Sequence, residues 1–471
     1  MLSSSLVKNA IFYSIGEILP RALSFILLPI YTCYLSPADY GITSYTQTII
    51  SFLSVLGAMA LNTYALRYYF IYKTDEERKE MLGSVHLSIA LVNLIILAVA
   101  FVIMPGIISY YHIQVPWDPY FKLAFIINFF ECLSFIPLVV YRVRQDAVKF
   151  VLLGFIRTLF SALLTLYFLV VEKRGLIGVF QAQLYVVVPY SFVYIYIIWK
   201  YSILKINLNY LKEGIKFSAP LIPSSICYML LSTSDRIILE RNVTMDELGI
   251  YNVAFQIALV LSIVIRSGYL AIEPELFKRF GKDGFYDFIR KVQSVYFCTI
   301  YVIALALSLF SQEVLYMMTS KAFHGGYILV PALMVGVIMT GQNVIYNGIL
   351  HGEKRTKVSG AATIVGAIVS VAVNLILVPV YGTYAAAAAS AFSFMVMNTI
   401  LFYAMTYPGK TMLRETLLVV MVPIFSYFVF FMIPEVCILG TFLKTIVILL
   451  YCIIASYLLK VNRGEFKLFF K

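Results

Sequence analysis

Charged residues are scarce in this chain. They make up 13% of its 471 residues, whereas an ordinary soluble domain carries about 25%. Hydrophobic residues make up 61% of the chain, and the mean hydropathy is +0.89. A soluble protein must cover its core with polar groups, so this composition excludes a soluble globular fold and predicts an integral membrane protein.

Several kinds of functional motif are absent as well. The six cysteines lie in or beside apolar segments and form no CxxC pair, which argues against a disulfide framework. The four histidines are scattered without an HExxH motif, so neither a metal site nor a cofactor is expected. No GxxxxGK[ST] loop occurs, and the polar connections are too short for a separate catalytic domain. These absences predict a protein that is not an enzyme.

The apolar segments have the length of membrane-spanning helices. About 20 apolar residues cross the hydrocarbon core of a bilayer, and this length predicts fourteen spans. The first apolar stretch contains no A-x-A cleavage site, so it is expected to remain as an uncleaved first span. The expected spans are residues 11–34, 41–66, 82–109, 120–141, 149–171, 176–198, 214–238, 249–273, 286–310, 327–350, 358–380, 383–406, 416–434 and 438–459.

Lysine and arginine residues are distributed unequally between the two sides of this arrangement. Connections on one side hold 26 of the 36 basic residues, and connections on the other side hold four. Basic residues favour cytoplasmic loops. The net charge of +12 is therefore attributed to membrane topology rather than to nucleic-acid binding, and both termini are predicted to be cytoplasmic.

Two short polar stretches repeat in one register. Pro37–Ile42 (PADYGI) and Met245–Ile250 (MDELGI) align without a gap at an offset of 208 residues. Six spans precede Lys200, so the seventh span starts on the same side as the first, and an even helix count gives parallel repeats related by an axis along the membrane normal. The alternative is a common interhelical turn that occurs twice by coincidence. The repeat predicts an all-α membrane protein with six-helix lobes in residues 1–205 and 206–410 and two further helices in residues 411–471.

Ionisable side chains inside the expected spans are candidates for a functional site. A charge within the bilayer is costly unless it faces a watery cavity or a partner. Arg157 and Arg266 have no carboxylate at helical spacing, which favours a cavity-facing role. Glu17 precedes Arg21 by one helical turn, and for these two a structural ion pair is an equal alternative.

Three further charged residues are candidates, whereas two lysines near the ends of expected spans are not. Glu131 lies midway along the fourth expected span. Asp235 and Arg236 are expected to close the seventh, where a helix C-terminus favours a cation. Lys444, like Lys122, lies near the end of an expected span and is predicted to snorkel to the membrane interface. The predicted substrate-binding residues are Arg21, Arg157, Arg236 and Arg266, and the candidates for coupling or ion pairing are Glu17, Glu131 and Asp235.

Three stretches of the sequence carry a family resemblance. The chain resembles the Wzx-type polysaccharide flippases of the multidrug/oligosaccharidyl-lipid/polysaccharide exporter superfamily. The resemblance implies a flippase for undecaprenyl-diphosphate-linked oligosaccharides in the bacterial cytoplasmic membrane, used for O-antigen, capsule or exopolysaccharide. The stretches are KNAIFYSIGEILPRALSFILLPIYTCYLSPADYGI (8–42), SDRIILERNVTMDELGIYNVAFQIA (234–258) and NGILHGEKRTKVSGAATIVGAIVSVAVNLILVPVYGTYAAAAAS (347–390).

The resemblance also implies a mechanism and partners. Two lobes would open alternately to the two sides of the membrane around a basic cavity, in which Arg21, Arg157 and Arg266 are expected to hold the lipid diphosphate, because arginine binds phosphate bidentately. Besides membrane lipid, a polysaccharide polymerase and a chain-length regulator are the implied partners.

Other functions stay open at this point. A lipid II flippase and a drug/cation antiporter belong to the same superfamily. In a different class, a membrane-embedded polysaccharide polymerase would need a large periplasmic loop, and an acyltransferase would need an intramembrane histidine. The sequence shows no such loop, and the one histidine within an expected span, His86, lies near the end of that span.

Overall fold

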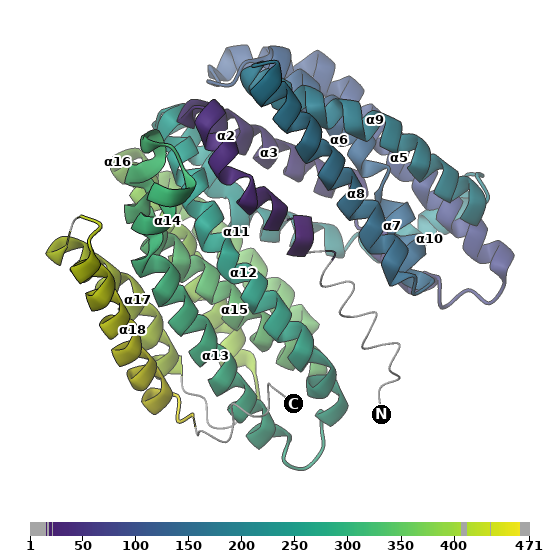
Figure 1. Cartoon of the computed structure of the whole chain (residues 1–471). Helices are drawn as coiled ribbons and strands as arrows, with labels where there is room; N and C mark the ends of the chain where they lie inside the picture. The colour runs from purple at the N-terminus through teal and green to yellow at the C-terminus, as the bar shows by residue number, and fades with distance from the viewer. Residues whose placement is uncertain (1–15, 17, 21, 407–411, 434, 462–471) are drawn as a thin grey trace. The chain divides into compact units, whose positions relative to one another are not determined.

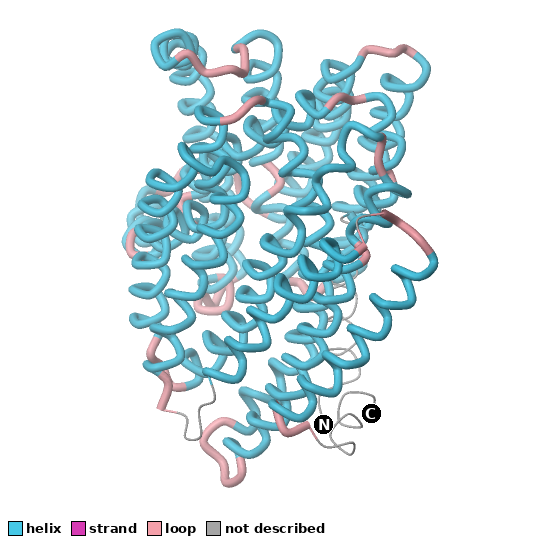
Figure 2. Tube along the Cα trace, turned by 90° about the vertical axis from the view of Figure 1, so that its left-hand side faces the viewer, coloured by secondary structure: helices cyan, strands magenta, loops and turns pink. Residues whose placement is uncertain are grey.

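The regular structure of this protein is helical. The computed structural model describes residues 16, 18–20, 22–406, 412–433 and 435–461. Figure 2 shows helices joined by short loops, and no strand occurs among these residues. The predicted all-α class is confirmed. The chain divides into two compact units, Met1–Met229 (unit 1) and Leu230–Lys471 (unit 2).

Unit 1 is a bundle of long and broken helices. Its elements are α2 (Leu28–Tyr34), α3 (Pro37–Ala58), α4 (Leu61–Tyr68), α5 (Asp75–Tyr111), η1 (Trp117–Phe121), α6 (Lys122–Cys132), α7 (Phe135–Val143), α8 (Ala147–Leu166), η2 (Tyr167–Val171), α9 (Gly175–Tyr201) and α10 (Leu208–Ser218). The helix α6 packs against α3, α5 and α9, and α8 packs against α9. Fully buried Tyr64, Met81, Val85, Ile136 and Ile198 join α4, α5, α7 and α9 in one apolar core.

Unit 2 is built around α13 and α15. The helix α11 (Leu221–Asn242) runs from unit 1 into unit 2, and the following elements are α12 (Met245–Arg279), α13 (Phe285–Leu309), α14 (Ser311–Met318), η3 (Lys321–Leu329), α15 (Val330–Gly352), α16 (Thr356–Ala404), α17 (Met412–Met432) and α18 (Ile438–Leu458). The helix α15 packs against α12, α13 and α16, while α17 and α18 pack on α13. Buried Tyr301, Tyr346 and Tyr451 lie in these contacts.

The helices have the length and composition of membrane spans. Among the described residues, ten helices are long and apolar enough to cross a bilayer, or up to twelve if each of two bent pairs, α3 with α4 and α10 with α11, is one span. The 49 residues of α16 would extend over about 74 Å at 1.5 Å per residue, more than twice the hydrocarbon thickness. Gly382 interrupts this helix with φ 57° and ψ −134°, so α16 contains two of the expected spans. The first expected span lies partly outside the described residues, and the count of fourteen stays a prediction.

Several helix starts in the first half of the chain recur in the second half at the 208-residue offset. Pro37 and Met245, which begin α3 and α12, are 208 positions apart. The same offset relates Ala147, the first residue of α8, to the residue just before α16. It also relates Gly175, the first residue of α9, to the residue just after the interruption at Gly382. Helix boundaries, and not only six letters of sequence, therefore recur at this offset.

The repeated polar stretches are helix caps. The Ser36 hydroxyl accepts a hydrogen bond from the Asp39 backbone N–H (3.2 Å), and the Asp39 carboxylate accepts one from the Ser36 backbone N–H (2.9 Å). Thr244 and Glu247 make the same pair of bonds, at 3.3 and 3.1 Å. Such a capping box satisfies backbone donors that a helix start leaves without partners. The stretch recurs because a long helix starts there in each half.

The connection between α9 and α10 is fixed to α5. The Ile203 backbone N–H donates to the carbonyl of Lys79 (3.0 Å), and the Ser84 hydroxyl donates to the carbonyl of Lys205 (2.7 Å). The helix α10 then packs on α4 and α5. It therefore belongs to unit 1, although it follows the expected lobe boundary at residue 205.

Candidate functional site

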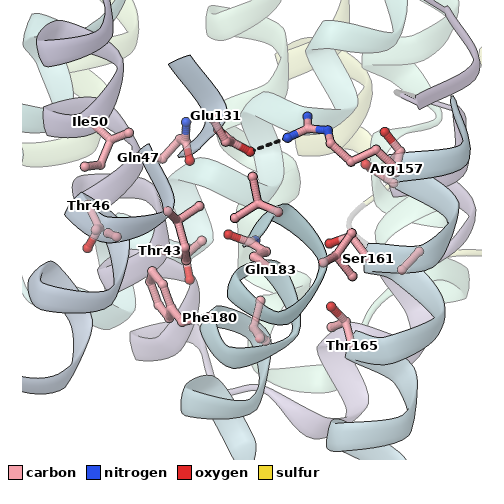
Figure 3. A pocket seen from close by; sticks show the side chains of 18 of the residues that line it. Thr43, Thr46, Gln47, Ile50, Glu131, Arg157, Ser161, Thr165, Phe180 and Gln183 are labelled. Carbon is pink, nitrogen blue, oxygen red and sulfur yellow. Dashed lines mark hydrogen bonds and ion pairs between the residues drawn. The ribbon is translucent and has the colours of Figure 1, made fainter. Parts of the chain in front are cut away.

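A polar cavity lies inside unit 1. Its volume is about 410 Å³, within the range of about 300–1,000 Å³ typical of small-molecule sites. Its walls come from α2 and the helical residues before it, and from α3, α6, α8 and α9 (Figure 3). The polar side chains that line it are Ser24, Tyr31, Thr43, Thr46, Gln47, Glu131, Arg157, Thr158, Ser161, Thr165 and Gln183.

An ion pair between two helices contributes the charges of this cavity. Arg157 on α8 donates from Nη1 to Oε1 of Glu131 on α6, at 2.6 Å (Figure 3). The two side chains remain 32% and 40% exposed. Guanidinium has five N–H donors, and among the described residues this is the one side-chain partner of Arg157. The remaining donors are available to a ligand in the cavity.

The sequence identified both members of this pair but not their contact. Arg157 was expected to face a cavity because no carboxylate stands at helical spacing from it, and Glu131 was a candidate for ion pairing. The carboxylate comes from a different helix, which a search along one helix cannot find. Arg157 therefore both lines the cavity and forms an ion pair with Glu131.

Uncharged side chains supply most of the polar lining. The hydroxyls of Thr43 and Thr46 donate to backbone carbonyls one turn earlier, at 2.8 and 2.6 Å, which leaves their oxygens free to accept. The Gln183 amide and the Ser161 hydroxyl line the cavity, and neither bonds to another group within the part of the chain that the structure describes. Sequence reasoning missed these residues because an uncharged polar residue in an apolar helix is a weak signal.

Arg236 has a different environment. It lies in unit 2 and is 6% exposed, with Nη1 at 3.1 Å from Oδ1 of Asp235 and its guanidinium over the ring of Phe255 (4.5 Å). The Tyr251 hydroxyl donates to the other oxygen of Asp235. Since α11 continues to Asn242, the expectation that Asp235 and Arg236 close their helix is wrong. A neighbouring carboxylate, not a helix terminus, compensates the charge of Arg236.

The structure does not test the other predicted site residues at this cavity. Arg266 lies on α12 with an exposed side chain, and Glu17 and Arg21 fall outside the described residues. The joint site of Arg21, Arg157 and Arg266 therefore stays a prediction. No group of three or more His, Cys, Asp and Glu residues suited to a metal ion occurs among the residues searched, which are those that the structure describes.

Lys444 corrects another expectation. Its side chain is 2% exposed, and its Nζ lies 2.5 Å from Oε1 of Glu313 on α14. The ammonium also lies near the rings of Phe310 and Phe430. Lys444 does not snorkel, because α18 packs its side chain against Glu313 and the two rings within unit 2. Lys122, by contrast, remains 44% exposed.

Comparisons with known proteins place the chain in a family. Residues 6–278, more than half of the sequence, match the family described as polysaccharide biosynthesis protein. The chain belongs to this family. It is 23% identical over 283 residues to Lsg locus putative protein 1 of Haemophilus influenzae, a match that covers 58% of this chain and 66% of that protein. This member thus spans just under two thirds of the curated relative it matches.

Solved structures with the same fold are transporters. The lipid II flippase MurJ, in an inward closed conformation, matches with a TM-score of 0.75 at 14% identity over 95% of this chain and 98% of MurJ. An inward-facing multidrug resistance transporter of the MATE family, MOP superfamily, matches with a TM-score of 0.63 at 14% identity, over 88% and 98% of the two chains. At such identities the likeness concerns the fold. This family member is a multi-pass membrane protein with the MurJ and MATE fold.

Proposed function

We propose that this protein is a flippase that moves undecaprenyl-diphosphate-linked oligosaccharide repeat units across the bacterial cytoplasmic membrane by alternating access. Family membership supports a role in polysaccharide biosynthesis, and the transporter fold supports translocation. The observation that carries the proposal is Arg157 in a polar cavity within a bundle of membrane helices. A lipid-linked oligosaccharide has an anionic diphosphate and a glycan rich in hydroxyls, and both must avoid hydrocarbon.

Arg157 is suited to the diphosphate end of this substrate. A guanidinium forms charge-assisted hydrogen bonds to phosphate oxygens through two N–H groups at once. Glu131 holds the Arg157 side chain in the cavity and uses one of its donors, so the diphosphate can bind to the others. Arg21 and Arg266 are proposed to complete the site, while Arg236, which pairs with Asp235, supports the interior of unit 2.

The product leaves on the periplasmic face, where the repeat unit would be used for O-antigen, capsule or exopolysaccharide. A polymerase and a chain-length regulator are therefore the proposed partners. Deletion of the gene should abolish the surface polysaccharide and accumulate lipid-linked repeat units. Unchanged polysaccharide would overturn the proposal. The MurJ fold supports a second candidate, a lipid II flippase, and depletion would then cause lysis rather than loss of polysaccharide.

The roles of Arg157 and Glu131 can be separated by a double-mutant cycle in the complemented deletion strain. We expect Arg157→Ala to reduce export at least tenfold at unchanged membrane levels, and Arg157→Lys to restore part of it, because lysine keeps the charge but not the fork of donors. The double variant with Glu131→Ala should stay as inactive as Arg157→Ala. If the pair is merely structural, the double variant removes both charges and recovers export, which would exclude substrate contact by Arg157.

A further inference from the structure

The uncharged part of the cavity in unit 1 has the chemistry of a carbohydrate site. In Figure 3 the Glu131–Arg157 pair lies at the top of the view, and Thr43, Ser161 and Gln183 lie below it on different walls. Their side chains are amide and hydroxyl groups, which both donate and accept hydrogen bonds. Sugar hydroxyls have the same dual capacity.

Two of these groups have unmet hydrogen-bonding capacity. Among the described residues, no protein group bonds to the Gln183 amide or the Ser161 hydroxyl, and both side chains are only partly exposed. Both groups line the cavity, so water, or a ligand with hydroxyls that displaces this water, can complete their hydrogen bonds.

Apolar side chains complete the lining. Phe180 is 5% exposed, and Phe180 and Ile50 line the same cavity as the amides and hydroxyls. A sugar ring has C–H faces that pack on apolar groups and an equatorial edge of hydroxyls. The apolar side chains suit the C–H faces of the ring, and the amide and hydroxyl groups suit its hydroxyl edge.

We propose that this cavity binds the first sugar of the lipid-linked oligosaccharide, with the attached diphosphate at Arg157 and the uncharged ring between Gln183, Ser161 and Phe180. This inference rests on the proposed function. The first sugar is bonded directly to the diphosphate, so a phosphate at Arg157 brings that ring next to the uncharged lining.

Photocrosslinking in cells tests the assignment. A photoreactive p-azidophenylalanine replaces Phe180 in the whole chain, and the cells receive a radiolabelled precursor of the first sugar of the repeat unit. The matched control has the same replacement at Phe192, a residue of the same helix that is 68% exposed. We expect at least fivefold more label on the Phe180 variant. The label should persist when synthesis is blocked after the first sugar and disappear when the first sugar-phosphate transfer is deleted.

Other outcomes overturn the inference. A crosslink to lipid without sugar label would make the cavity a lipid site, and an exporting Phe180 variant without a sugar crosslink would remove the sugar from it. If that variant does not accumulate, Gln183→Leu should reduce export at least tenfold and Gln183→Asn less, both at unchanged membrane levels and thermal stability. Full export by Gln183→Leu would contradict the subsite. These results leave the proposed function standing, since that depends on the deletion phenotype.

Discussion

At the scale of single residues, Arg157 and Lys444 show two uses of a charge in a membrane helix. Arg157 keeps a third of its side chain exposed in a polar cavity. Lys444 is fully buried against Glu313 and two aromatic rings. A buried pair contributes little net stability, but loss of one partner leaves an uncompensated charge. Arg157 is therefore available to a ligand, whereas Lys444 serves packing.

Removal of one member of the buried pair should destabilise unit 2. We expect Lys444→Met to lower the free energy of unfolding by about 3–5 kcal/mol, because Glu313 is left without its counter-ion. Adding Glu313→Gln should recover most of that loss. Thermal unfolding of the detergent-purified protein measures both effects. Lys122→Met, in an exposed pair with Asp118, is the control and should change stability by about 0–1 kcal/mol. Equal losses for both lysines would contradict the burial argument.

These residues also show what sequence could identify. Arg157 and Glu131 were found because a charge in an apolar segment is conspicuous. Gln183 and Ser161 were missed because their importance comes from a cavity that five helices build together. Lys444 was misplaced because its distance from a helix end along the chain does not reveal what packs around it.

At the scale of elements, the close contact between α5 and the α9–α10 connection depends on Gly83. A Cβ on Gly83 would lie 1.9 Å from the carbonyl oxygen of Ile203, so the backbone would have to move. We expect Gly83→Ala to lower the free energy of unfolding by about 2 kcal/mol or more. Gly106 on the same helix has no atom within 4 Å of the equivalent Cβ, and Gly106→Ala should raise stability by about 0.5–1 kcal/mol. Thermal unfolding distinguishes the two. Equal effects would mean that this contact is not tight.

Hydropathy predicted the elements better than their interruptions. An apolar stretch gives the position of a helix because the bilayer requires about 20 such residues. It does not show that the expected span 214–238 is two helices bent by 51°, or that the expected span 41–66 is two helices bent by 45°. Those features follow from local backbone geometry. The capping boxes at Ser36 and Thr244 are the reverse case, since a short polar motif marked two helix starts.

At the scale of the whole molecule, the repeat preserves helix boundaries but not the site. The residues 208 positions after Glu131 and Arg157 are Met339 and Val365. Neither can form an ion pair, so the second half contains no copy of the polar pair. The two halves therefore differ at these repeat-related positions, and this polar pair belongs to unit 1.

The same repeat makes a prediction about sidedness. Parallel repeats require corresponding connections of both units to face the same side of the membrane. Lys73 in unit 1 and Lys278 in unit 2 belong to the basic set of connections, and Lys173 and Lys321 belong to the opposite set. All four side chains are exposed, so labelling of cysteines at these positions reports which side they face.

Cysteine labelling of intact cells tests that arrangement. After replacement of the exposed native cysteines Cys33 and Cys437 by serine, a membrane-impermeant maleimide should label Lys173→Cys and Lys321→Cys from outside. Lys73→Cys and Lys278→Cys should react only after lysis, because basic connections are retained in the cytoplasm. Inverted repeats would reverse the pattern in unit 2 alone. Outside labelling of Lys278→Cys together with protection of Lys321→Cys would therefore reject parallel lobes. The expected result, with corresponding basic connections of both units on the cytoplasmic side, requires an even number of membrane crossings between those connections.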